Sequence, residues 1–340
     1  MRLSSFLKWN RVIGLLVLIG LVGIFWTQKA CSVREPLAPT ALGPNKYTAL
    51  QGMVEGVLYR KEAPFLITGN LIIPENKTLV IQAGVTLYFE PHTALIVLGT
   101  LKAIGRQESF ITFTAKEENW QGIQIFTQKT PSVFRFCIIE KIVRDAYGDA
   151  GYGGIVLQNA SAKFMNCLIR WNRSYLGGGL AALSSELELL NTIFKENEAI
   201  SMGGALLLVQ SRSRVINNTF YKNFSQNVGG ALVLFNPVFD DLQNNIVFQN
   251  RSDQGDPRLE IMHAGADSYR NQYNFLAVSE PDPLFRSEAD LRLQPGSPCR
   301  DQGNPAPEFR DPDSTRNDQG AFGGPLGNWI SPEVKETRDN

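Results

Sequence analysis

One stretch of the chain gathers aromatic, acidic and basic side chains within a single short segment. It lies between Ile142 and Gly153, and its candidate ligand-binding residues are Arg144, Asp145, Tyr147, Asp149 and Tyr152. Tyrosine rings offer flat faces to the C–H surface of a sugar, and an arginine fork can bind a carboxylate through two hydrogen bonds. Aspartate oxygens accept hydrogen bonds from hydroxyl groups. This mixture predicts a carbohydrate-binding loop.

A second charged stretch follows Asn250 and contributes two further candidates, Asp253 and Arg258. Both stretches leave the same position of a repeating unit, four units apart. At about 4.8 Å for each stacked unit, the two loops would lie about 19 Å apart and could rim one shallow groove. The alternative is that the two loops only flank the ends of the regular part of the chain.

Acidic residues near the C-terminus suggest a weak cation site. Asp311, Asp313 and Asp318 place oxygen ligands close together in sequence, which suits Ca²⁺. The spacing of an EF-hand loop is absent, because the third acid and the distal Glu are missing, so turn formation is the favoured role for these residues. Apart from this weak Ca²⁺ candidate we expect no cofactor.

These candidate sites depend on a repeat that runs from residue 153 to residue 250. Each unit has a Gly-Gly pair, a short apolar run, a polar turn and a second apolar run, with one Asn inside the second run and another at its end. The internal Asn residues form a first column, made of Asn166, Asn191, Asn217 and Asn244. The closing Asn residues form a second column, made of Asn172, Asn197, Asn223 and Asn250. The second column advances by 25, 26 and 27 residues, a period typical of solenoids.

The apolar runs are short, rich in Leu, Ile, Val and Phe, and bounded by Gly, Asn and Ser, which favours strands. A unit of about 25 residues cannot bury its own apolar face, so it must stack on its neighbours. We therefore predict an all-β fold, a right-handed parallel β-helix. We expect both Asn columns to point inward at bends and to bond like to like, and the Gly pairs to permit tight corners.

Two cysteines fall in one column of the repeat. Cys137 and Cys167 occupy equivalent positions in adjacent units, which places their α-carbons within about 5 Å, a separation that a disulfide tolerates. Side chains stacked in parallel strands point the same way, so a buried pair of thiols suits the geometry as well. Cys31 and Cys299 have no evident partners.

The N-terminus carries a targeting signal. Arg2, Lys8 and Arg11 precede an uncharged apolar run from Val12 to Trp26. This pattern predicts an uncleaved signal anchor, a transmembrane helix with its N-terminus inside, because the residues before Cys31 make a poor cleavage site. A cleaved signal peptide and lipidation of Cys31 are the alternatives, and all three would export the rest of the chain.

The chain divides into four predicted regions. We expect a signal anchor at residues 1–31, a Pro-containing tether at 32–58, the β-helix at 59–280, and a segment at 281–340 that caps the last coil. A cap strand at Tyr47–Tyr59 is the alternative to the tether in that range. The 340 residues include 33 basic and 33 acidic side chains, so no excess of positive charge points to nucleic acid as a partner.

Two motifs carry a resemblance to known proteins. Gly203–Leu206 and Gly229–Leu232, taken with Phe194–Asn197 and Phe220–Asn223, resemble the repeats of chlamydial polymorphic outer-membrane proteins. More broadly the chain resembles bacterial right-handed β-helix proteins of the pectin-lyase-like superfamily. The segment from Ser297 is similar to the C-terminal segment of surface-anchored bacterial β-helix proteins, although Gln302 and Gln319 depart from that pattern.

The resemblance implies two kinds of function. The first is a membrane-anchored, extracytoplasmic binding or structural module, in the periplasm or at the cell surface, that contacts polysaccharide or a cell-surface protein. The second is a polysaccharide lyase or glycoside hydrolase. Asp240 and Asp241 are adjacent acids, but the other motifs of a polygalacturonase-like site are missing, so the enzyme rests on analogy of fold. We predict the binding module, with no assignment of catalytic residues or of an oligomeric state.

Overall fold

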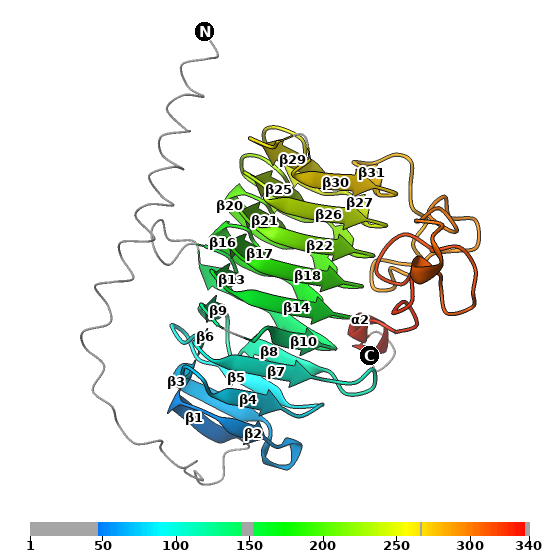
Figure 1. The fold of residues 1–340 in the computed structure, drawn as a ribbon. Helices are drawn as coiled ribbons and strands as arrows, with labels where there is room; N and C mark the ends of the chain where they lie inside the picture. Colours follow the sequence, from blue (N-terminus) through cyan, green and yellow to red (C-terminus); the bar gives the residue numbers. More distant parts are fainter. Residues whose placement is uncertain (1–46, 129, 145–151, 266, 337–340) are drawn as a thin grey trace, which may run out of the picture.

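The computed structural model describes residues 47–128, 130–144, 152–265 and 267–336, and these residues form a parallel β-solenoid (Figure 1). The predicted all-β solenoid and its repeat are therefore confirmed. The signal-anchor range 1–31, with Cys31, lies outside the described residues. Within the described part of the chain, no helix is long and apolar enough to cross a membrane.

The strands form three sheets. The largest has seventeen strands: β1 (Thr48–Met53), β3 (Phe65–Ile73), β5 (Thr86–Phe89), β6 (Leu95–Val97), β8 (Ile111–Ala115), β9 (Ile123–Phe126), β11 (Cys137–Glu140), β13 (Ile155–Gln158), β15 (Leu168–Arg170), β17 (Leu180–Leu183), β19 (Ile193–Lys195), β21 (Leu206–Val209), β23 (Thr219–Tyr221), β25 (Leu232–Phe235), β27 (Ile246–Phe248), β29 (Leu259–Met262) and β31 (Phe275–Ala277). It consists of two stacks that converge on the long strand β3, which pairs with both β5 and β6.

The second sheet has nine strands: β2 (Gly56–Leu58), β4 (Thr78–Ile81), β7 (Thr100–Ile104), β10 (Ser132–Arg135), β14 (Ser161–Met165), β18 (Glu186–Leu190), β22 (Arg212–Ile216), β26 (Phe239–Gln243) and β30 (Tyr269–Gln272). The third has five: β12 (Val143–Arg144), β16 (Arg173–Leu176), β20 (Glu198–Met202), β24 (Phe224–Ser225) and β28 (Arg251–Ser252). Three short helices complete the described chain: η1 (Arg60–Glu62), η2 (Pro307–Phe309) and α2 (Pro332–Glu336).

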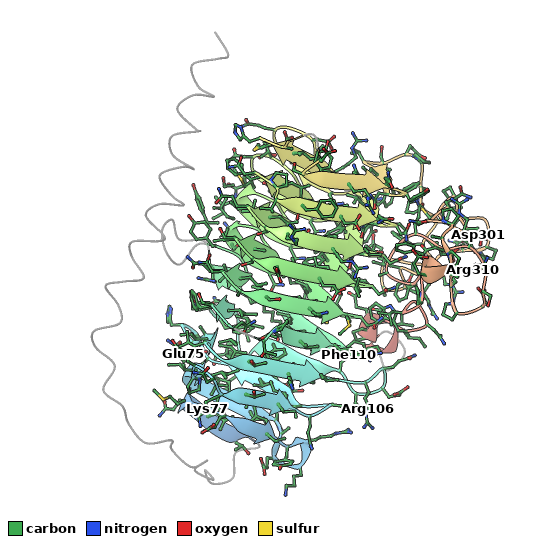
Figure 2. The ribbon with its side chains drawn as sticks, viewed as in Figure 1. Glu75, Lys77, Arg106, Phe110, Asp301 and Arg310 are labelled. Atoms are coloured by element: carbon green, nitrogen blue, oxygen red, sulfur yellow. The ribbon has the colours of Figure 1, made fainter. Side chains whose placement is uncertain are left out.

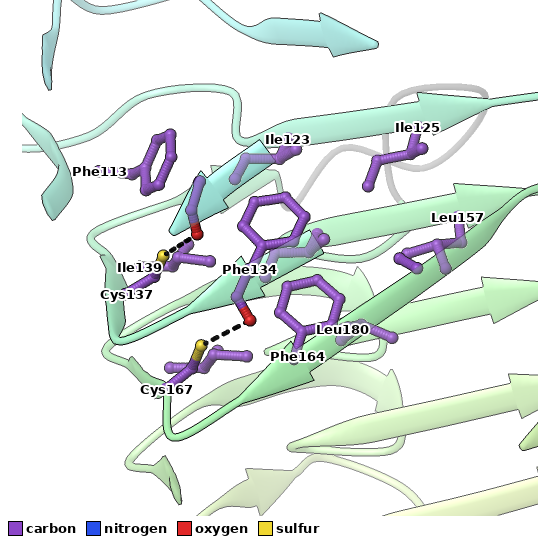
Figure 3. Packing of buried hydrophobic residues seen from close by; sticks show 14 of the residues in the cluster. Phe113, Ile123, Ile125, Phe134, Cys137, Ile139, Leu157, Phe164, Cys167 and Leu180 are labelled. Atoms are coloured by element: carbon purple, nitrogen blue, oxygen red, sulfur yellow. Dashed lines mark hydrogen bonds between the residues drawn. The ribbon is translucent and has the colours of Figure 1, made fainter. Parts of the chain in front are cut away.

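Each regular coil follows the same path. The coil from β13 runs through β14 and β15 to β16, and every strand pairs in parallel with its equivalent one coil later. Alternate side chains point into the coil, where like residues stack. The Phe134 and Phe164 ring centroids lie 4.4 Å apart (Figure 3), and those of Phe194 and Phe220 lie 5.1 Å apart. The core is thus a set of apolar columns along the solenoid axis.

The second Asn column is an interior ladder. The main-chain N–H and the side-chain amide of Asn197 both donate to Oδ1 of Asn223, at 2.9 and 3.0 Å. Asn172 donates in the same way to Asn197, and Asn223 to Asn250. All four residues are buried, so the ladder satisfies polar groups at the bend that water cannot reach.

The first Asn column differs from the expectation that it points inward. Asn166, Asn191, Asn217 and Asn244 adopt the left-handed conformation, with φ between 49° and 58°. Their side chains turn out of the coil and bond to the C-terminal segment. The residue after each Asn points inward instead, so that Thr192 donates its N–H to Oδ1 of Asn218, and Asn218 donates to Asn245. At this bend the interior ladder is displaced by one residue from the column that the sequence singled out.

The Gly pairs lie at the corner between the five-stranded sheet and the largest sheet, as Gly203 and Gly204 do between β20 and β21. Gly203 and Gly229 have φ of 70° and 63°. A Cβ added to Gly204 would lie 2.1 Å from the carbonyl oxygen of Gly230 and 2.5 Å from that of Phe224. The close approach of neighbouring coils therefore excludes any side chain at this position.

Cys137 and Cys167 are both free and buried, so of the two alternatives the structure has the thiols (Figure 3). Each Sγ donates to a carbonyl oxygen of the preceding coil, Ala103 at 3.4 Å and Phe134 at 3.6 Å respectively. Burial raises the pKa of the Cys137 thiol well above its usual value, and the neighbouring Cys167 adds to the rise. Cys299 is also a free, buried cysteine.

The solenoid begins earlier than predicted. β1 and β2 lie inside the range 32–58 that we expected to be a tether, which corrects that boundary and supports the cap-strand alternative. β1 pairs in parallel with β3, because its half-buried Leu50 packs against the core. The last strand of the largest sheet, β31, ends at Ala277, close to the predicted boundary at 280.

The C-terminal segment (residues 281–336) does not cover the last coil as predicted, but runs back along the side of the solenoid toward β10 (Figure 1). Figure 2 shows Asp301 and Arg310 on this segment, beside the coils. It covers an apolar outer face of the largest sheet in a second hydrophobic cluster, in which Leu291, Cys299 and Trp329 pack with Ile193 and Phe248. Burial of this face explains the position of the segment.

Candidate functional site

The two predicted ligand-binding loops adjoin the same sheet. Arg144 ends β12, the first strand of the five-stranded sheet, and Asp253 follows β28, the last. Four strand spacings separate them, about 19 Å. Asp145, Tyr147 and Asp149 lie outside the described residues, so the structure gives no geometry for the centre of the first loop.

Arg144 is turned inward. Its guanidinium is buried and donates to the carbonyl oxygens of Tyr152 and Gly153 at 2.9 and 3.1 Å. Burial lowers the pKa of Arg144 to about 10. Tyr152 is half-buried and pairs through its main chain with Leu176. Arg144 therefore holds the end of the loop in place, which corrects its expected role as a fork for a ligand carboxylate.

Arg258 is also occupied by a partner within the chain. Its Nε and Nη2 donate to the two carboxylate oxygens of Asp256 at 2.9 and 2.8 Å. The hydrogen bonds of this pair lower the pKa of Asp256 and raise that of Arg258. Asp253 is exposed, and its N–H donates to the carbonyl oxygen of Ser225. Of the two candidates in the second loop, Arg258 is therefore bonded to Asp256, whereas Asp253 faces solvent.

Sequence reasoning missed Trp171. It lies at the bend between β15 and β16 with φ of 56°, and it is 42% exposed. Its indole N–H donates to Oε2 of Glu196 in the next coil at 2.7 Å. The Arg170 guanidinium carbon lies 3.9 Å from the ring centroid. A large ring is thus held in a fixed orientation at the surface.

A signal for Trp171 was present in the sequence. The residue before each closing Asn takes the left-handed conformation and lies at the outer corner, where the other coils have Lys141, Glu196, Lys222 and Gln249. The other residues of this outward column are polar, and the fold does not require an aromatic ring there. The tryptophan therefore stands out as a candidate for binding.

The outer surface of the five-stranded sheet continues from Trp171. One register column carries Val143, Arg173, Glu198, Phe224 and Arg251. Arg173 lies 3.8 Å from Glu198, and the Arg251 guanidinium stands 5.3 Å from the Phe224 ring centroid. We name Trp171, Arg173, Glu196 and Phe224 the corner surface. It combines rings and charges of both signs on a flat wall.

A buried ion network lies behind the corner surface. Glu140, Arg170 and Lys195 occupy one register column of β11, β15 and β19, and Glu333 of α2 covers them. Nε of Arg170 donates to Glu140 at 2.8 Å, and Nη1 donates to Glu333 at 3.1 Å. Nζ of Lys195 lies 2.9 Å from the same oxygen of Glu333. This network joins the end of the C-terminal segment to the coils.

The calcium candidates have structural partners. Asp311 accepts hydrogen bonds from the N–H groups of Asp318 and Gly324, and burial raises its pKa to about 6. Asp318 accepts from the N–H of Asp301 at 2.8 Å, and Asp313 accepts from Thr315 at 2.6 Å. In the described part of the chain no group of three or more His, Cys, Asp or Glu residues could hold a metal ion.

Comparison with known proteins gives a local similarity. No protein-family model matches the chain, and no solved structure matches it. One segment is similar to Protein bark beetle of Drosophila melanogaster, with 43% identity over 53 residues. That segment covers 16% of this chain and 2% of the fly protein.

Proposed function

We propose that the chain is a membrane-tethered, extracytoplasmic right-handed parallel β-helix that binds polysaccharide of the envelope or the extracellular space. The basic and apolar N-terminal sequence supports the tether. The solenoid supports the membership in the pectin-lyase-like superfamily that the repeat motifs suggest. Those motifs have structural roles: Phe194 and Phe220 stack in the core, and Gly203 and Gly229 form corners. The motifs therefore carry the fold and leave the ligand to surface residues.

The observation that carries the proposal is Trp171. A β-solenoid wall is flat and stiff, so a sugar chain can lie along it where an exposed ring offers a stacking face. The hydrogen bond to Glu196 and the contact with Arg170 fix this ring before any ligand arrives. A fixed ring loses little conformational freedom on binding. Arg173 and Glu196 lie near it to bond sugar hydroxyls.

Binding of the full-length chain to immobilised glycans tests the proposal. We expect Trp171→Ala to weaken glycan binding at least tenfold and Trp171→Phe to keep most of it. Tyr273→Ala is a matched control, because Tyr273 is 40% exposed and has φ of 55° at another corner. Unchanged binding by Trp171→Ala, or an equal loss in Tyr273→Ala, would contradict the proposal. Scoring the same samples for product tests the alternative, a polysaccharide lyase or glycoside hydrolase.

Fluorescence gives an independent readout. Within the described residues the other tryptophans, Trp120 and Trp329, are buried. We expect glycan binding to shift the emission of Trp171 and to protect it from an aqueous quencher. A ligand that binds without either effect occupies a different surface.

A further inference from the structure

The first coils carry an exposed apolar cluster on the nine-stranded sheet. Val57, Tyr59 and Ile104 are each more than a third exposed, at 36%, 42% and 46%. Their neighbours along the strands, Leu58 and Ala103, are buried in the core, so these three side chains point outward. Single exposed hydrophobic residues are ordinary on a protein surface, whereas a cluster of them indicates an interaction site.

The strand pairing places these side chains in two adjacent columns. β2 pairs with β4, β4 with β7, and β7 with β10, and Tyr59 continues β2 in an extended conformation. Neighbouring members of a column are about 4.8 Å apart. The first column contains Val57, Val80, Lys102 and Val133, and the second contains Tyr59, Gln82, Ile104 and Arg135. We name these two columns the β2–β10 surface.

The charges of the β2–β10 surface are positive. Its two columns contain Lys102 and Arg135 and no acid. The short helix η1 at its edge adds Lys61, whose Nζ lies 5.4 Å from the ring centroid of Tyr59. Glu62 of the same helix is exposed and opposes part of this charge. The surface therefore combines apolar side chains with a small excess of cations.

Farther along the solenoid the first column has a different charge pattern. It continues through Lys163, Glu188, Arg214, Asp241 and Arg270. Glu188 pairs with Lys163 and with Arg214, each at 2.7 Å, and Arg270 lies 3.7 Å from Asp241. The cations of the later coils are thus balanced within the sheet, and the apolar, basic section belongs to the first coils.

The β2–β10 surface lies at the end of the solenoid where the described chain begins (Figure 1). In the proposed topology a membrane anchor precedes this end, and residues 27–47 join the anchor to β1. A short linker raises the effective concentration of a tethered surface to about the millimolar range. A surface of modest affinity can then bind the membrane, because the tether has already removed much of the translational freedom that association costs.

We propose that the β2–β10 surface docks on the anionic lipid bilayer that carries the anchor. Val57, Tyr59 and Ile104 enter the interfacial region, where aromatic and aliphatic side chains are stabilised. Lys61 and Lys102 pair with the negatively charged headgroups. This inference rests on the membrane anchor of the proposed function and adds a second contact, which fixes the orientation of the solenoid on the membrane.

Release of the solenoid by proteolysis tests the proposal. The full-length chain, with a site for a specific protease inserted after Gly43, is reconstituted into phosphatidylcholine vesicles with or without phosphatidylglycerol. After the cut, we expect at least about fivefold more of the solenoid to sediment with the vesicles that contain phosphatidylglycerol than with the others. Raised salt should release it, because ions screen the headgroup charge.

A double variant tests the apolar contribution. We expect Tyr59→Ser combined with Ile104→Ser to reduce the sedimentation of the cut solenoid at least about fivefold, because the rings and methyl groups no longer enter the interface. Tyr273→Ser combined with Val238→Ser is the matched control, since these side chains are 40% and 52% exposed in later coils. Thermal unfolding of both double variants checks that the solenoid remains folded.

A single variant tests the charge. We expect Lys102→Gln to reduce sedimentation with the phosphatidylglycerol vesicles and to leave the smaller amount on pure phosphatidylcholine unchanged. Arg270→Gln is the matched control, because it lies in the same column at the other end of the sheet. An equal effect of the two variants would show that the overall charge of the protein, and not this surface, causes the binding.

The uncut chain distinguishes this proposal from the proposed function. If the vesicles hold the uncut chain but lose the wild-type solenoid after the cut at low salt, the anchor stands and the docking surface is wrong. The docking surface is also wrong if the Tyr59 and Ile104 double variant stays on the vesicles as the wild type does. If the vesicles do not hold the uncut chain, both fail. The vesicles carry no glycan, so binding at Trp171 does not contribute to the result.

Discussion

Asn217 and Asn317 lie 100 residues apart in sequence and exchange two hydrogen bonds of 3.1 Å, each amide donating to the carbonyl oxygen of the other. Asn217 also donates to the main-chain oxygens of Asp318 and Gly320. The pair is buried, so these bonds have no water to replace them. One coil side chain thus ties the C-terminal segment to the middle of the solenoid.

We predict that Asn217→Leu lowers the free energy of unfolding by about 2 kcal/mol or more, because the change removes the amide that donates to Oδ1 of the buried Asn317 and to the main-chain oxygen of Asp318. Chemical denaturation measures the change, with the exposed Arg212→Ala of the same coil as control. We also expect faster proteolysis of the C-terminal segment. A midpoint equal to that of the control would show that the pair contributes nothing.

We predict that Gly204→Ala prevents stable stacking of the regular coils, with a loss of more than about 3 kcal/mol. The added methyl group would meet main-chain oxygens of the next coil, which cannot move without breaking the parallel pairing. Gly265→Ala is the control, since its nearest neighbour would lie 3.9 Å away. Soluble expression and thermal unfolding measure the effect. Equal stability of the two variants would show that neighbouring coils do not approach Gly204 as closely as described.

Stability should fall as pH rises between about 4 and 7. Asp240 is buried inside a coil and accepts from the Ser213 hydroxyl at 2.6 Å, and burial raises its pKa to about 6. The folded state therefore binds a proton that the unfolded state, with an ordinary pKa near 3.9, has already lost in this range. Asp240 favours folding below pH 4 relative to pH 7 by on the order of 2 kcal/mol. Asp311 acts in the same direction.

The variant Asp240→Asn isolates this effect. It keeps an acceptor for Ser213 and carries no charge, so we expect a higher Tm than the wild type at pH 7.5 and little difference at pH 4. Asp253→Asn, at an exposed position, should show no such dependence on pH. The prediction fails if the Tm difference between Asp240→Asn and the wild type is the same at both values of pH.

The N-terminal sequence predicts the topology of the protein in the membrane. On the proposed topology, in which Arg2, Lys8 and Arg11 would keep the N-terminus inside, a reporter fused after Asn340 should be active only outside the cytoplasm. Mass spectrometry of the mature protein should recover residues at or next to Met1. A mature N-terminus at Cys31 or Ser32 would contradict the uncleaved anchor and favour lipidation of Cys31 or a cleaved signal peptide.

The repeat was predictable because stacked coils impose equivalent residues on equivalent positions. The roles of the two Asn columns were not. At each bend one residue takes the left-handed conformation and points outward, and the next points inward: Asn166 then Cys167 at one bend, Trp171 then Asn172 at the other. Asn suits both positions, so residue type alone could not assign them. Alternation counted from the inward Phe164 or Ile169 would place Asn166 and Trp171 inside, but the left-handed residue at each bend shifts the alternation by one residue.

The candidate site was harder to predict than the coils. Charged residues in the two loops marked a plausible face, yet Arg144 and Arg258 bond within the chain. Those partners lie only two and eight residues away, but residue type does not show that the side chains turn toward them. Sequence distance does hide Glu333 from Lys195, since 138 residues separate them. Only the folded path of the C-terminal segment brings that carboxylate onto the coils.

The ladder from Asn172 to Asn250 has a direction. At every step the earlier coil supplies two N–H donors and the later coil supplies the oxygen that accepts both. A newly formed coil therefore presents two donors to the segment that follows it, and the arrival of that segment completes its predecessor. A chain that crosses a membrane from its N-terminus onward would thus assemble in the order in which it emerges, each turn acting as the template for the next.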